Sequence, residues 1–128
     1  MNHLDAALVD AAEAAGFDGQ DFGQRGAALV QLESGRRAGL EHTPCGIAVY
    51  VSHHLPYDAG AWLRRAWRRN HYSCQEDWPV QAALSERDGN THLVALTRIA
   101  DADFSPQRLQ QALDYLARWL DAVRDDAY

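Results

Sequence analysis

The chain has 128 residues, a length that suits one domain with a core of useful size. Its net charge is −6, and all twelve basic residues are arginine. An acidic domain is a poor nucleic-acid binder, because phosphate contacts need a positive field. No apolar run approaches about 18 residues, so no membrane span is expected. The acidic N-terminus lacks the basic region of a secretory signal.

The first half of the chain predicts one helix followed by three strands. The range 4–15 is rich in alanine and carries an apolar stripe, and Gly16 is placed to end this helix. We expect a loop over 17–23, although it carries two phenylalanines. Strands are expected at 26–33, 38–42 and 47–52. Their short connections predict an antiparallel meander.

The middle of the chain, 58–70, predicts a helix with two unlike faces. One stripe is apolar and contains Trp62, Leu63, Ala66 and Trp67. The opposite face contains Arg64, Arg65, Arg68 and Arg69. Three interpretations of the arginine face stay open: a solvated surface, a docking surface for an acidic partner, and an RNA-binding surface.

The second half predicts a hairpin and a final helix. The ranges 80–86 and 91–99 alternate between apolar and polar residues around a turn. Ser105 and Pro106 start the last helix as N-cap and first helical residue. Its apolar stripe is Leu109, Leu113, Leu116, Leu120 and Val123. The whole order predicts an α+β fold over 1–128, with an antiparallel sheet packed against helices.

The sequence predicts no catalytic, metal or cofactor site. His53 and His54 are adjacent, so their rings point to opposite faces of a strand. Cys45 lies near His42 but has no third group of the kind that an activated nucleophile needs. Cys45 and Cys74 have no metal-like spacing, and we expect reduced thiols, with a single bridge as the alternative.

Aromatic residues are abundant for a chain of this size, with four tryptophans and five tyrosines. One layer of helices on five strands is not expected to cover all of the large aromatic side chains. Uncovered apolar surface points to a partner or to a second copy of the chain. The alternative is that all of this surface closes inside the monomer.

This order of elements resembles the class I chaperones of bacterial type III secretion systems. The strand IAVYVSHHLP followed by AWLRRAWRRN is similar to their strand and second helix, which often closes on an asparagine. The hairpin VQAALSERDGNTHLVALTRI and the helix QRLQQALDYLARWLDAV match their last three elements in length and pattern. The stretch 74–79 and the arginine-only basic set depart from the family pattern.

The resemblance implies a cytoplasmic homodimer without enzymatic activity or cofactor, acting in protein transport and virulence. It implies binding of the N-terminal region of a secreted effector in extended form, which keeps the effector competent for export. Neither nucleic acid nor membrane is an implied partner. The implied dimer interface is Trp62, Leu63, Ala66, Trp67, Val80, Ala82 and Leu84. The implied effector-binding residues are Leu4, Leu8, Val9, Phe17, Phe22, Ala27 and Leu29.

Other functions stay open beside this one. A regulatory adaptor or anti-activator of the same fold would sequester another small secretion-system protein. An RNA-binding module would use the arginine face together with tryptophan stacking, which the net charge opposes. An enzyme remains the third class, although the sequence offers no catalytic constellation.

Overall fold

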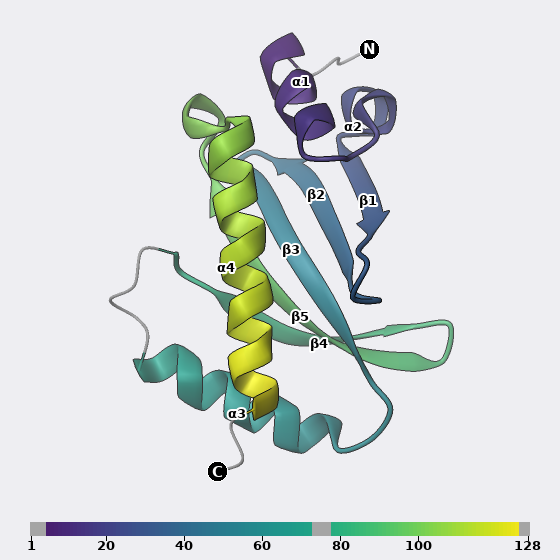
Figure 1. Cartoon of the computed structure of the whole chain (residues 1–128), viewed down its shortest axis with the longest axis vertical. Helices are drawn as coiled ribbons and strands as arrows, with labels where there is room; N and C mark the ends of the chain where they lie inside the picture. Colours follow the sequence, from purple (N-terminus) through teal and green to yellow (C-terminus); the bar gives the residue numbers. More distant parts are fainter. Residues whose placement is uncertain (1–4, 73–77, 126–128) are drawn as a thin grey trace.

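A five-stranded antiparallel sheet forms the centre of the fold, and a helix of 20 residues crosses one face of it (Figure 1). The computed structural model describes residues 5–72 and 78–125. Its elements in chain order are α1 (Ala6–Ala14), α2 (Gly19–Arg25), β1 (Ala27–Gln31), β2 (Arg37–Thr43), β3 (Gly46–Leu55), α3 (Ala59–Tyr72), β4 (Gln81–Arg87), β5 (Asn90–Ile99), the 3₁₀ turn η1 (Asp101–Asp103) and α4 (Pro106–Asp125). The predicted α+β class is confirmed.

The strand order in the sheet is β1-β2-β3-β5-β4. The predicted meander of the first three strands and the predicted β4–β5 hairpin are both confirmed. The returning strand β5 pairs with β3 along the full length from Ile47↔Ile99 to Leu55↔Thr91. The two halves of the chain therefore share one sheet, and β1 and β4 form its two edges.

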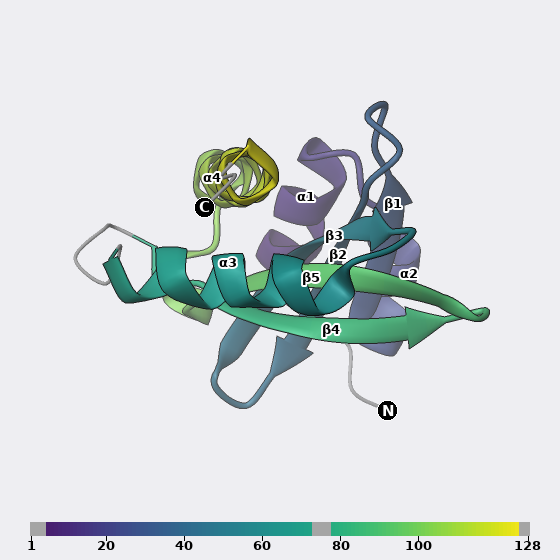
Figure 2. The same ribbon diagram turned by 90° about the horizontal axis from the view of Figure 1, so that it is seen from below.

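The core lies between one face of the sheet and the helices α1 and α4. Figure 2 views α4 along its axis on one side of the sheet, with α1 beside it. The predicted apolar stripe of α4 is buried throughout, and Ile47, Val49 and Val51 of β3 face it with no exposed surface. The apolar side of the strands, which follows a period of two, thus packs against the heptad-like apolar stripe of the helix, and both are buried.

The expectation of a loop over 17–23 is wrong, because the helix α2 occupies most of this range. The carboxylate of Asp18 starts the helix by accepting hydrogen bonds from two first-turn backbone N–H groups at 3.0 and 3.1 Å. Phe22 is fully buried, and its ring centroid lies 6.3 Å from that of Phe104. The short helix explains why this range is more apolar than a connecting loop requires.

The helix ends follow the sequence signals more closely. Gly16 takes a positive φ of 96°, and the N–H of Phe17 donates to the carbonyl of Ala12 at 3.0 Å. This is the pattern of a glycine-ended helix. At the start of α4, the Ser105 hydroxyl accepts from the N–H of Arg108 at 3.1 Å, as expected of an N-cap.

A buried arginine connects the β1–β2 turn to both α4 and β3. Arg36 is only 7% exposed. Its Nη2 lies 2.7 Å from a carboxylate oxygen of Asp121, and its Nη1 donates to the carbonyl of Ala117 at 3.2 Å. Its Nε donates to Nδ1 of His53 at 3.0 Å. The guanidinium therefore holds three polar groups, of which two belong to α4 and one to β3.

Replacing Arg36 with alanine is expected to lower the free energy of unfolding by about 2–3 kcal/mol, because one charge-assisted contact and two hydrogen bonds are lost together. Urea unfolding measures this directly. Arg37→Ala is the matched control, since this neighbouring side chain is exposed. Equal losses in both variants would show that the buried contacts of Arg36 contribute nothing specific.

Candidate functional site

The two edge strands of the sheet are the first candidate binding surfaces. Just beyond the two ends of β1, the N–H of Leu32 donates to the carbonyl of Arg36 at 2.8 Å, and the carbonyl of Gly26 accepts from the N–H of His42 at 2.7 Å. Backbone groups of an antiparallel strand alternate in direction, so the even-numbered residues of β1 bond to β2. The N–H and carbonyl groups of Ala27 and Leu29 therefore point away from the sheet, at an edge suited to pairing with another strand.

The proposed effector-binding residues lie in different environments. Leu29 is 53% exposed at the β1 edge, and Ala27 and Val9 are half-buried. The other described members of the set are packed in the core: Leu8, Phe17 and Phe22. Leu4 lies outside the described residues. Pattern alone did not separate these groups, because an apolar residue of an amphipathic element looks the same whether it meets the core or a partner.

The proposed dimer residues lie on α3, on β4 and, for Val80, directly before β4; the two elements pack against each other. Trp67 is 57% exposed and Leu84 is 38% exposed. Ala66 and Val80 are buried in the core. The remaining three members are partly buried: Trp62, Leu63 and Ala82. The helix and the edge strand thus each present one large exposed apolar side chain.

Contacts around Trp62 hold α3 against the rest of the fold. Its ring stacks on His53 with centroids 5.1 Å apart and an interplanar angle of 25°. The guanidinium of Arg65 lies 5.0 Å from the centroid of the same ring, and its Nε donates to the carbonyl of Val123 at 3.2 Å. The cation thereby connects the start of α3 to the end of α4.

The arginine face predicted on the middle helix is not a single surface. Arg64 and Arg68 are exposed, whereas Arg65 and Arg69 are partly buried. Arg65 already contacts Trp62 and the end of α4. The four side chains of this predicted face thus differ in exposure, and one of them already has partners inside the fold.

The sheet face opposite α4, here called the open sheet face, carries a row of apolar side chains that the sequence analysis did not single out. The strand registers align Leu29, Gly39, Tyr50 and Leu96 across four strands. A Cβ atom at Gly39 would collide with the ring of Tyr50, so this ring lies over the glycine. Burial there raises the pKa of Tyr50. The row can be identified only from the pairing register of the strands, which the local sequence pattern does not give.

Groups that could support chemistry are sparse in the described ranges. No cluster of three or more His, Cys, Asp or Glu residues suited to a metal ion occurs within 5–72 and 78–125. Cys45 is exposed, and Nε2 of His42 lies 2.9 Å from a carboxylate oxygen of Asp101. Cys74 lies outside the described residues. No helix in these same ranges has the length and apolar character needed to cross a membrane.

Among the described residues, no strand pairs with the outer edge of β1 or β4, and each of these strands carries an exposed leucine. Unpaired edges and exposed apolar side chains are features to which another strand can add. No model of a known family and no curated protein matches the chain. Among solved structures, a chain of the HopA1-SchA chaperone-effector complex is similar to it, with a TM-score of 0.58 and 15% sequence identity, covering 93% of this chain and 91% of that chain. The protein thus has a type III secretion chaperone fold, as the resemblance predicted.

Protonation of His53 is expected to destabilise the fold, since its Nδ1 accepts a hydrogen bond from Arg36 and therefore carries no proton. Burial, with Arg36 and Arg124 nearby, lowers the pKa of His53, against a smaller opposing effect of Asp121. A lowered folded-state pKa gives stability that is present above the unfolded value, near pH 6.5, and is lost as pH falls through the folded-state pKa.

Urea unfolding across this pH range tests the expectation. The wild type should lose stability on acidification more steeply than His53→Gln, which lacks this titration; the loss of the imidazole ring lowers the variant's stability at every pH and leaves the comparison of slopes intact. His92 also has a lowered pKa, caused first by burial and then by His54 and two arginines, and it contributes equally to both proteins. Identical slopes for wild type and variant would contradict the role given to His53.

Proposed function

We propose that this protein is a type III secretion chaperone that binds the N-terminal region of a secreted effector in extended form and keeps it competent for export. It acts as a cytoplasmic homodimer, by binding alone, without a catalytic step or cofactor. The observation that carries the proposal is the chaperone fold, which extends over 93% of the chain and leaves the β1 edge open.

In the proposal, the effector segment adds to the sheet beside β1. The outward N–H and carbonyl groups of Ala27 and Leu29 pair with its backbone, which gives affinity with little dependence on sequence. The side chains of the segment alternate between the two faces of the sheet. Those on the open sheet face extend the apolar row that starts at Leu29. A segment paired in this way stays extended, because its backbone groups are no longer available for its own fold.

The α1–α2 region supports this edge. Val9 lies on α1 close to Gly23 of α2, where an added Cβ would come within 3.3 Å of the valine side chain. Phe17 and Phe22 pack beneath in the core. In the proposal these two phenylalanines position α1 and α2, and the partly exposed Val9 contacts the effector.

The dimer is proposed to form through α3 and β4 about a two-fold axis. Trp67 and Leu84 are the exposed members of this surface, and Leu63 and Ala82 lie partly buried beside them. A two-fold interface uses the same patch on both protomers, so it buries the two copies of each exposed side chain. A large aromatic residue at such a position is a frequent centre of binding energy.

Co-expression with the protein encoded by the neighbouring gene, followed by gel filtration with light scattering, tests the function. We expect two copies of this chain with one partner, and loss of the complex when the N-terminal segment of the partner is removed. A monomer that binds no partner would count against the proposal.

The mode of binding is tested at Leu29. Leu29→Ala and Leu29→Pro both remove the leucine side chain, but only proline also removes the outward N–H without removing a bond to β2. Proline should weaken effector binding about five- to tenfold beyond alanine, as titration calorimetry would show. Equal affinities for the two variants would exclude strand addition at β1.

Trp67→Ala is expected to raise the dimer dissociation constant at least about 30-fold. Because this side chain is largely exposed in the single chain, the unfolding free energy of the monomer should change little. Analytical ultracentrifugation measures the constant, and the exposed neighbour Arg68→Ala serves as the control. A Trp67→Ala protein that remains as dimeric as the control would place the interface elsewhere.

A further inference from the structure

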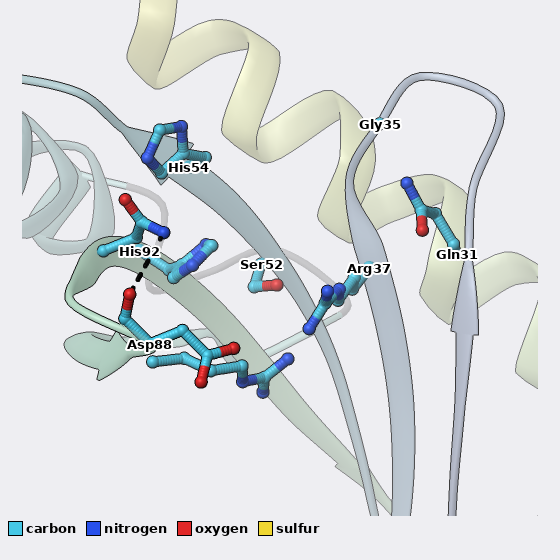
Figure 3. Close-up of a pocket in the computed structure, with 9 residues that line it drawn as sticks. Gln31, Gly35, Arg37, Ser52, His54, Asp88 and His92 are labelled. Carbon is cyan, nitrogen blue, oxygen red and sulfur yellow. Dashed lines mark hydrogen bonds between the residues drawn. The ribbon is translucent and has the colours of Figure 1, made fainter.

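A shallow polar hollow of about 190 Å³ lies at one end of the open sheet face (Figure 3). The strand registers bring its residues together. Arg37 of β2 pairs with Ser52 of β3, and two residues further along β3 His54 pairs with His92 of β5. Residues two apart in a strand share a face, so these four side chains all belong to the open sheet face. The sheet therefore supplies most of the lining, and Gly35 and Asp88 of the two adjoining turns complete it.

The hollow gathers positive charge in an acidic protein. Arg37 and Arg87 both line it, and one carboxylate, that of Asp88, accompanies them. Within the described ranges, neither arginine side chain forms a hydrogen bond or an ion pair with the protein. Arg36, by contrast, holds three polar groups. Two guanidinium groups therefore keep all their donors available for a ligand.

The two histidines add a proton-dependent component. The ring centroids of His54 and His92 lie 5.3 Å apart. The pKa of His92 is lowered first by burial and then by His54, Arg87 and Arg37. The two arginines make a positive charge on His92 unfavourable, and an anion between these groups would reverse that effect.

We infer that this hollow binds an oxyanion, a phosphate or a carboxylate group, held by Arg37 and Arg87 with His54 and His92 as further donors. A planar guanidinium suits both kinds of anion, because two parallel N–H groups can meet two oxygens. The charged groups that face the histidines are Arg37 from β2, Arg87 from β4 and Asp88 from the hairpin turn. Since binding favours the charged imidazoles, the affinity rises as pH falls.

Two probes separate the two sources of such an anion. Sulfate stands in for phosphate, because it stays a dianion throughout the pH range of interest. The blocked tripeptide acetyl-Ala-Glu-Ala-amide carries a single carboxylate. Each is titrated into the full chain at constant ionic strength, and the histidine side chains are followed by NMR. We expect saturable shifts of His54 and His92 with at least one probe, and about fourfold or more tighter binding at about pH 6 than at about pH 7.5.

Variants decide whether the binding belongs to the hollow. The double variant Arg37→Gln/Arg87→Gln should weaken binding at least about tenfold, which corresponds to about 1.4 kcal/mol. Arg98→Gln, an exposed arginine on the same sheet face outside the hollow, should leave binding unchanged. The double variant His54→Gln/His92→Gln should remove the pH dependence.

The two probes and the variants together identify the anion and its site. Binding of sulfate alone assigns the hollow to a phosphate-type anion, and binding of the peptide alone assigns it to a carboxylate of a polypeptide. Shifts that do not saturate with either probe overturn the inference. Binding that survives Arg37→Gln/Arg87→Gln, or that Arg98→Gln weakens equally, also overturns it. The result does not depend on whether an effector binds at β1.

Discussion

The contacts of Arg36 connect the elements that decide the shape of the binding surfaces. A single guanidinium joins the β1–β2 turn to two positions on α4 and to His53 on β3. The ring of His53 then stacks on Trp62, which holds α3. A buried charge is tolerated only when its donors are used, and here the use of three of them orders the turn, the long helix and the middle helix together.

This arrangement places both long helices on one face of the sheet. The opposite face and the edges β1 and β4 then remain open, because nothing in the described ranges pairs with their outer sides. An open edge is a risk for a protein that must stay monomeric, and natural sheets commonly blunt or cover it. Here Leu29 on one edge and Leu84 on the other are exposed, which supports the proposal that partners cover these edges.

The arginines of this chain serve different purposes, although the sequence makes them look alike. Arg36 and Arg65 are satisfied by the protein and hold elements together. Arg37 and Arg87 make no such contacts with the residues that the structure describes, and they lie on the open sheet face. A structural arginine and a ligand-binding arginine therefore differ in whether the fold itself supplies their acceptors.

Local pattern by itself determined the strands, the hairpin, the long helix and the α+β class, because period and cap signals act over a few residues. It did not determine which of two similar residues meets the core. Phe22 was expected in a loop and is fully buried, whereas Trp67 lies on a predicted apolar stripe and is mostly exposed. Arg36 and Arg37 are neighbours with identical side chains, and only the first is buried. That choice depends on Asp121 of α4, which is far away in the sequence, so only the tertiary structure could decide it.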